Sequence, residues 1–355
     1  SGGGGGGLQG GTSSFGAAPA GEWRGLGGNR GMNGVTAGVS VSGVTDSTTQ
    51  LSNSANGYIT ITSYTAPGIT FNGTVNGNKS LAVSAGSGNV TFSGAVGASQ
   101  ALGALTVNAT GSTTFSSSVN AASLTTNAGG TTAINGGAIT TTGAQTYYDA
   151  VTLGAATTLN TTNNNIAFAS TLNSTTSARA LTIGAGTGTV TFTGTVGNSL
   201  ALGATNITAA TTTNTTTLVG SGVYAITGDA VINGAITGVT NLSVSGATTI
   251  GANITTSGTQ LYSGAVTLTV NTTLTTTDSN VTFGSTLNSN NGTAKTLTIA
   301  AGAGTVTMNG AVGGSNVLGA TTITAGTFTT GSAGTIAMGT NALTINTDVI
   351  NIGEV

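Results

Sequence analysis

Few residues of this chain belong to the types that usually perform chemistry. Histidine and cysteine are both absent, which removes the common general base, the thiolate nucleophile and most ligands of transition metals. The remaining charged residues are widely spaced along the sequence. We therefore predict that the protein is not an enzyme and uses no cofactor or metal ion. The charged residues are the acids Glu22, Asp46, Asp149, Asp229, Asp278, Asp348 and Glu354 and the bases Arg24, Arg30, Lys79, Arg179 and Lys295.

The acidic residues also lack the spacing of known calcium sites. The Gly-Gly-x-Gly-x-Asp run of calcium-binding β-rolls does not occur in the chain. Asp149, Asp229 and Asp278 each stand beside residues that form turns. We interpret these three acids as turn caps rather than as metal ligands.

The charge and hydropathy of the chain exclude two further kinds of partner. With a pI near 4.6 and a net charge of −2, the chain offers no basic patch that could neutralise phosphates. We therefore expect no binding to nucleic acid. A membrane-spanning helix needs about 18 or more consecutive apolar residues, and no such run is present. We therefore expect no insertion into a membrane.

The sequence repeats itself over a long distance. The octet VTFSGAVG at Val90–Gly97 returns as VTFTGTVG at Val190–Gly197 and as VTMNGAVG at Val306–Gly313, with offsets of 100 and 116 residues. Leucine motifs precede and follow each copy at matching distances. Self-similarity at a fixed period is typical of a repeat array rather than of a globule with one active site. The flanking motifs are Leu81–Val83, Leu181–Ile183 and Leu297–Ile299 before the octets, and Leu102–Ala104, Leu202–Ala204 and Leu318–Ala320 after them.

A shorter period lies within the long one. Apolar triplets with strand-forming residues recur roughly every 20 residues, which is the length of one coil of a parallel β-helix. Around Val190 and Phe192, polar and apolar residues alternate, so these two side chains should point inward and the threonines outward. Phe92, Phe192 and Met308 share one repeat position, and all three should be buried. The triplets begin at Ile69, Val90, Thr113, Thr132, Val151, Ile166 and Val190.

Composition favours strands throughout. Threonine and valine are stiff at χ1 and suit strands, whereas the 61 glycines and the many asparagines supply turns. Disorder is a poorer interpretation, because 37% of the residues are hydrophobic and the net charge is small. We predict an all-β parallel β-helix, or β-solenoid, with coils of about 20 residues over residues 43–355. A Gly-rich N-terminal segment, residues 1–42, should precede it.

The repeat units carry a family resemblance. The motifs Leu181–Ile183, Val190–Gly197 and Leu202–Ala204, together with Gln145–Tyr147 and Gln260–Tyr262, resemble the repeats of filamentous-haemagglutinin-type adhesins and autotransporter passengers of bacteria. The resemblance covers roughly residues 57–330 and implies a secreted, right-handed β-helix that is adhesive or matrix-forming. The chain departs from the two-partner secretion type, because it lacks the Asn-Pro secretion signatures.

These features together predict a non-enzymatic extracellular structural protein, the β-solenoid subunit of a bacterial surface fibre, filament or matrix. One alternative is the stalk or binding region of a large secreted adhesin, which would contact host or surface glycans through exposed aromatics, with Tyr147, Tyr148, Tyr224 and Tyr262 as the candidates. Another is an ice-binding β-solenoid, since Thr-x-Thr occurs at Thr60–Thr62, Thr189–Thr191 and Thr305–Thr307. Tyr147 and Tyr262 recur at equivalent positions, so we expect them to pack inside or at a coil edge.

The ends of the solenoid predict self-association. A solenoid end exposes unpaired backbone groups unless a cap covers it. Ala342–Ile352 is an apolar strand-like run and resembles an open end, with Ile350 and Ile352 as candidate contacts. The slim Gly-rich segment is a possible docking arm, with Trp23 and Arg24 as its candidate anchors. We therefore expect a head-to-tail homopolymer.

Overall fold

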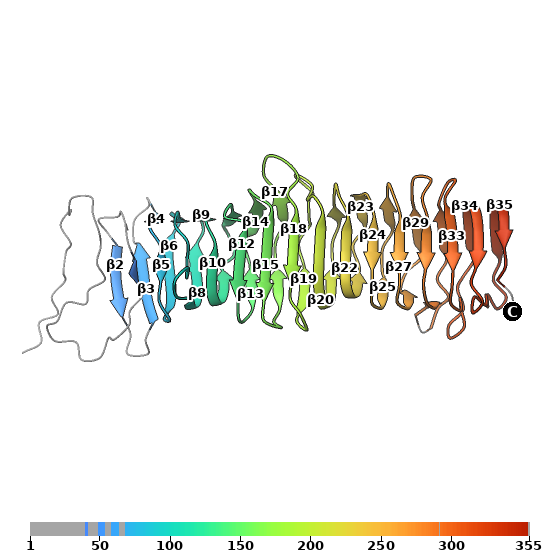
Figure 1. Ribbon diagram of the computed structural model, residues 1–355, viewed down its shortest axis with the longest axis horizontal. Coiled ribbons are helices and arrows are strands. Elements are labelled where there is room, and N and C mark those ends of the chain that lie inside the picture. The colour runs from blue at the N-terminus through green and yellow to red at the C-terminus, as the bar shows by residue number, and fades with distance from the viewer. Residues whose placement is uncertain (1–39, 42–48, 54–57, 64–67, 291, 354–355) are drawn as a thin grey trace, which may run out of the picture.

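The computed structural model describes residues 40–41, 49–53, 58–63, 68–290 and 292–353, and it has the shape of an elongated rod (Figure 1). Parallel strands stack as a β-solenoid of about 13 turns, with coils of roughly 21 residues. The described residues contain no helix. At a strand spacing of about 4.8 Å, these turns form a stack about 60 Å long. The predicted fold class is therefore confirmed.

Each coil contributes one strand to each of three faces, which we call A, B and C in the order in which the chain visits them. Within a face, each strand pairs in parallel with the strand one coil earlier and one coil later. The isolated bridges of Val96, Val196 and Val312 continue this pairing where a coil has no full strand. Longer strands turn a corner and serve two faces in succession.

Face A contains β3 (Tyr58–Ser63), β6 (Ser80–Gly86), β8 (Leu102–Ala109), the second half of β10 (Val119–Thr126), β13 (Gln145–Tyr147), β16 (Ile166–Phe168), β19 (Thr189–Phe192), the second halves of β20 (Thr205–Asn214) and β22 (Tyr224–Ile232), β25 (Thr248–Ile250), β28 (Val266–Leu268) and β31 (Leu287–Ser289). Face B contains β4 (Gly68–Phe71), β7 (Asn89–Phe92), β9 (Ser112–Phe115), β11 (Thr131–Ile134), β14 (Ala150–Leu153), β17 (Leu172–Ser174), β21 (Leu218–Val219), β23 (Ile236–Val239), β26 (Ile254–Thr256), β29 (Thr272–Thr275), β32 (Leu297–Ala300) and the first halves of β34 (Thr321–Thr330) and β35 (Leu343–Asn351). Face C contains β5 (Val75–Asn76), the first half of β10, β12 (Ala138–Thr141), β15 (Thr157–Thr161), β18 (Leu181–Gly184), the first halves of β20 and β22, β24 (Leu242–Val244), β27 (Gln260–Tyr262), β30 (Val281–Phe283), β33 (Thr305–Met308) and the second halves of β34 and β35.

The pairing changes direction at the N-terminal end of the described rod. β2 (Thr49–Asn53) pairs antiparallel with β3, and β1 (Ser40–Val41) pairs antiparallel with β5. Parallel stacking therefore starts at β3, and this end differs from the C-terminal end, where β35 follows β34 in parallel.

The core follows the alternation that the sequence predicts. Val190 and Phe192 are buried, whereas Thr191 between them is half-buried and faces outward. Phe92 and Met308 are buried in the same way, which confirms the predicted register. In-register pairing brings rings of successive coils face to face, and such pairs each contribute about 0.5–1.5 kcal/mol beyond their burial. The stacks are Phe71–Phe92–Phe115 at 4.6 and 5.2 Å, Tyr147–Phe168–Phe192 at 5.0 and 5.3 Å, and Tyr262–Phe283 at 5.4 Å.

The long repeat does not contain a whole number of coils. Val90 lies in β7 on face B, Val190 in β19 on face A, and Val306 in β33 on face C. Because the chain visits the faces in the order A, B, C, each copy is turned by two-thirds of a turn relative to the one before it. Equivalent residues of the three copies therefore lie on three different faces of the rod. The sequence repeat alone does not reveal this rotation between copies, because the number of residues per coil varies.

Candidate binding surfaces on the rod

The C-terminal end of the described rod exposes part of its core. β35 pairs with β34 on one side, and no described strand covers its other edge. Ile350 is in register with Phe328, which is fully buried. Ile350 thus occupies a core position of the last described coil, yet 54% of its surface is exposed, and Ile352 is 64% exposed. This end combines free backbone groups with apolar side chains, which is the combination that strand addition uses.

The other two candidate contacts, Trp23 and Arg24, lie outside the described residues, as does the whole stretch 1–39. The structure therefore places Ile350 and Ile352 together at one end of the rod. It does not bring them to Trp23 or Arg24.

The predicted turn caps hold neighbouring coils together. Asp229 Oδ1 accepts a hydrogen bond from Ala247 N–H at 2.8 Å, and Asp278 Oδ1 accepts one from Ala303 N–H at 2.8 Å. In both pairs the donor lies one coil further along the chain, so each acid caps the turn of the next coil rather than its own. Asparagines do the same, since Asn89 Oδ1 accepts from Ser112 N–H at 2.8 Å. These two carboxylates are therefore engaged in coil stacking.

Asp149 is the one buried carboxylate among the described residues. It accepts hydrogen bonds from Gly130 N–H at 2.8 Å and from the Thr132 hydroxyl at 3.1 Å. Burial raises the pKa of the Asp149 carboxyl, and these two hydrogen bonds lower it by less. The described residues contain no group of three or more metal-binding side chains, so Asp149 belongs to no such cluster.

The structure buries three of the four candidate tyrosines and exposes the fourth. Tyr147 and Tyr262 are buried, as predicted from their repeat positions, and their hydroxyls donate to Gln145 and Gln260 at 2.9 and 3.0 Å. The expectation that Tyr224 is exposed is wrong, because Tyr224 is the first residue of β22 and points into the core. Tyr148 remains as an exposed aromatic, with 49% of its surface accessible.

Outward threonines form rows that run across coils. On face B, Thr70, Thr91 and Thr114 are in register, but Ala133 follows them. On face A the row from Thr106 is interrupted by an alanine and a valine. An ice-binding surface needs a regular lattice, and these broken rows do not favour that function. The members of the face A row are Thr106, Thr125, Thr146, Ala167, Thr191, Thr213, Val231, Thr249 and Thr267.

A pair of surface loops recurs with each copy of the long repeat, and we call it the loop pair. Its first loop runs from an asparagine to a basic residue, and its second loop lies one coil further along and runs from glycine to glycine. The three copies, whose end residues in part belong to the flanking strands, are 76–79 with 97–103, 173–179 with 197–203, and 288–290 and 292–295 with 313–319. In every copy the asparagine Oδ1 accepts a hydrogen bond from a serine N–H of the second loop. The bonds are Asn76 with Ser99 at 3.0 Å, Asn173 with Ser199 at 2.9 Å, and Asn288 with Ser315 at 3.1 Å.

A second hydrogen bond fixes the basic residue in every copy. A glycine N–H of the second loop donates to the backbone carbonyl of the basic residue in the first loop. The pairs are Gly103 with Lys79 at 3.0 Å, Gly203 with Arg179 at 2.8 Å, and Gly319 with Lys295 at 2.8 Å. We did not expect these basic residues to share a role, although their offsets of 100 and 116 residues match those of the octets and could have revealed it.

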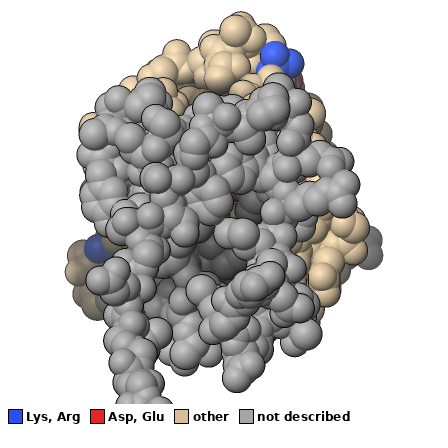
Figure 2. Space-filling view, turned by 90° about the vertical axis from the view of Figure 1, so that its left-hand side faces the viewer, with Lys and Arg blue, Asp and Glu red and all other residues tan. Residues whose placement is uncertain are grey.

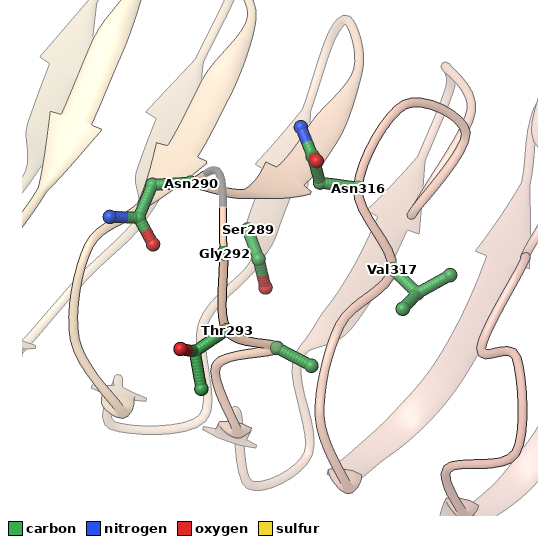
Figure 3. A pocket seen from close by; sticks show the side chains of 7 residues that line it. Ser289, Asn290, Gly292, Thr293, Asn316 and Val317 are labelled. Carbon is green, nitrogen blue, oxygen red and sulfur yellow. The ribbon is translucent and has the colours of Figure 1, made fainter.

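The third loop pair encloses an open pocket of about 220 Å³ (Figure 3). Ser289, Asn290 and Thr293 come from its first loop, and Asn316 and Val317 from its second loop. The lining therefore combines hydroxyl and amide groups with Gly292 and with the apolar side chains of Ala294 and Val317. Asn290 Oδ1 is buried and has no hydrogen-bond partner among the described residues.

Comparison with models of known protein families gave no match for this chain. Comparison with curated protein sequences gave none either. In the part of the chain that the structure describes, no helix has the length and apolar character needed to cross a membrane.

Proposed function

We propose that this protein is a non-enzymatic structural protein of the bacterial cell surface, and that its rods join end to end into an extracellular fibre, filament or matrix. The exposed core position of Ile350, directly beyond the buried Phe328, carries this proposal. A coil placed on β35 would complete the strand ladder and cover both isoleucines. A second copy of the chain is the occupant we propose.

The two ends of the rod support head-to-tail rather than head-to-head contact. Antiparallel strands close the N-terminal end of the described rod, whereas a parallel coil is exposed at the C-terminal end. Two different surfaces make a heterologous contact, which need not close and therefore builds a filament. In this proposal the Gly-rich segment 1–42 docks on the neighbouring rod through Trp23 and Arg24.

A pair of adjacent substitutions tests the contact at the C-terminal end. Ile350→Lys puts a charge over the exposed core, whereas Val349→Lys puts the same charge one residue earlier on the outward side of β35. We expect Ile350→Lys to abolish or shorten filaments in electron micrographs, and Val349→Lys to leave them largely unchanged. Equal assembly of both variants would overturn the proposed contact.

Removal of Ser1–Met32 tests the role of the Gly-rich segment. Assembly should be lost while the β-type circular dichroism spectrum persists, because the deletion leaves the coils intact. Unchanged filaments after this deletion would remove the segment from the proposal. Intact protein that stays strictly monomeric at high concentration would contradict polymerisation itself.

The second candidate function is the stalk of a secreted adhesin. The elongated rod suits a spacer that holds a binding region away from a surface. Electron micrographs distinguish the two functions, because a stalk appears as separate rods and a fibre subunit as long filaments.

A further inference from the structure

The three basic residues of the loop pairs stand on three sides of the rod. The first loop joins face C to face A in the first copy, face B to face C in the second, and face A to face B in the third. Lys79, Arg179 and Lys295 therefore lie at three different corners. Figure 2, which views the rod along its long axis, shows Lys and Arg side chains at separate positions around the outline rather than in one patch. From the coil length, successive copies are about 23 and 27 Å apart along the axis.

These three residues are the only basic residues in the part of the chain that the structure describes. The residues after them differ in all three copies, and the residue before them is asparagine in one copy and alanine in two, yet the positive charge recurs even where lysine becomes arginine. Only 3% of the residues in this chain are charged. A positive charge that recurs at the same position of all three repeat copies therefore points to a role for that charge. The preceding residues are Asn78, Ala178 and Ala294, and the following residues are Ser80, Ala180 and Thr296.

The structure gives these cations no role in holding the rod together. The recurring hydrogen bond uses the backbone carbonyl of each basic residue and not its side chain. Arg179 Nη2 donates to Thr176 in its own loop at 3.3 Å, and none of the three cations forms an ion pair with a described carboxylate. Arg179 Nε is buried without a hydrogen-bond partner among the described residues. Both Arg179 Nε and Asn290 Oδ1 thus belong to loop pairs and lack partners.

We infer that each loop pair binds an acidic polysaccharide, with the cation pairing with a sugar carboxylate and the neighbouring hydroxyl and amide groups binding sugar hydroxyls. The pocket of the third copy provides such groups on Ser289, Thr293 and Asn316, and Val317 offers an apolar contact to a sugar ring. Since the copies face three ways, one rod can hold polymer strands on three sides and cross-link them. This inference deepens the proposed matrix function by naming its partner, but it does not require end-to-end assembly.

The geometry favours polysaccharide over nucleic acid. Tight binding to nucleic acid needs several phosphates to be neutralised along one face. Here each of the three corners carries one basic residue in its loop pair, and the pocket of the third copy, whose lining ends at Ala294 next to Lys295 in the sequence, is lined by neutral residues. One cation with several neutral donors and acceptors suits a carboxylated sugar, and linkage of three weak sites raises the overall affinity.

The test uses the full chain carrying Ile350→Lys, so that polymerisation does not contribute to binding. The probes are polygalacturonate, neutral dextran and duplex DNA at low salt, with binding followed by co-sedimentation. The test variant adds Lys79→Gln, Arg179→Gln and Lys295→Gln. The control variant adds Thr125→Glu, Thr191→Glu and Thr267→Glu, which change the net charge equally at outward positions of face A. Circular dichroism confirms that both variants fold.

We expect the glutamine variant to lose polygalacturonate binding about tenfold or more, and the glutamate variant to lose far less. Single glutamine variants should reduce cross-linking, measured as turbidity, before they reduce binding. An equal loss in both variants would show a general charge effect and overturn the inference, as would unchanged binding in the glutamine variant. Binding of dextran or DNA as strong as that of polygalacturonate would overturn the assignment to acidic sugars. None of these outcomes depends on filament formation, which the unmodified chain tests separately.

Discussion

Phe192 on β19 stacks on Phe168 on β16 with ring centroids 5.3 Å apart and ring planes inclined by 10°. The two rings belong to successive coils of face A and lie in register. A substitution at this position therefore disturbs the contact between two coils as well as the core of one.

Phe192→Asp should strongly destabilise the rod. The change removes a buried ring and leaves an unpaired carboxylate in the core, so we expect the free energy of unfolding to fall by at least about 4 kcal/mol. Thr191→Asp is the matched control, because Thr191 faces outward on the same strand and should cost little. Thermal melting followed by circular dichroism compares the two. An unaltered melting temperature in Phe192→Asp would contradict the register.

Removal of the hydroxyl group should affect stability differently at the three buried tyrosines, because two of the hydroxyls have a hydrogen-bond partner and one has none among the described residues. Tyr147→Phe leaves Gln145 Oε1 without its donor, so we expect a loss of about 1–3 kcal/mol. Tyr262→Phe should behave alike, because Tyr262 donates to Gln260 in the same way. Tyr224 has no partner for its buried hydroxyl among the described residues, so Tyr224→Phe should be neutral or stabilising. Equal losses in all three variants, measured by thermal melting, would contradict this assignment.

Two adjacent glycines test the corner geometry. Gly313 has a φ of 71° and a Cβ there would collide with the Ala337 carbonyl of the next coil, so Gly313→Ala should cost at least about 1–2 kcal/mol. Gly314 is exposed, and its Cβ would meet only the Ala311 side chain at 3.4 Å. Gly314→Ala should therefore be tolerated. If the melting temperature falls by the same amount in Gly313→Ala and Gly314→Ala, the described turn is wrong.

Asp149 predicts a pH dependence of stability. Its folded-state pKa is raised by burial, so the folded protein binds the proton more tightly than the unfolded chain does. The stability that this group contributes is present below the pKa of the unfolded chain and is lost as the pH rises through the folded-state pKa. Asp149→Asn should remove this dependence, because an amide does not titrate in this range. The amide can also keep the hydrogen bonds to Gly130 and Thr132, so the variant should still fold.

Urea unfolding at a series of pH values measures this effect. The stability of the wild type should fall relative to that of Asp149→Asn as the pH rises from strongly acidic values toward neutrality. A wild type that gains stability relative to Asp149→Asn over this range would show that the sign is wrong.

Local alternation was enough to predict which side chains form the core. Val190, Thr191 and Phe192 alternate in polarity, and a strand with one buried face allows only one register for such a pattern. Tyr224 was misassigned, because an isolated tyrosine carries no repeat partner that would mark its position as internal. The phase of the long repeat was also beyond the sequence, since it depends on how loops of different length share each coil.

The candidate surfaces were predicted only in part. Ile350 and Ile352 were recognised from the apolar run that contains them, and their exposure depends on the coil in which they lie. The loop pairs were missed, although Lys79, Arg179 and Lys295 could have been aligned by their offsets alone. Their positions on three corners required the strand pairings, which the sequence does not state.

The aromatic stacks follow the same rotation as the repeats, and this has a mechanical consequence. Phe71–Phe92–Phe115 stiffens face B, Tyr147–Phe168–Phe192 stiffens face A, and Tyr262–Phe283 stiffens face C. A beam reinforced along one side bends toward a preferred direction, whereas a beam whose reinforcement moves around its axis resists bending evenly. The described rod should therefore flex isotropically under load, with its compliance averaged over all three sides.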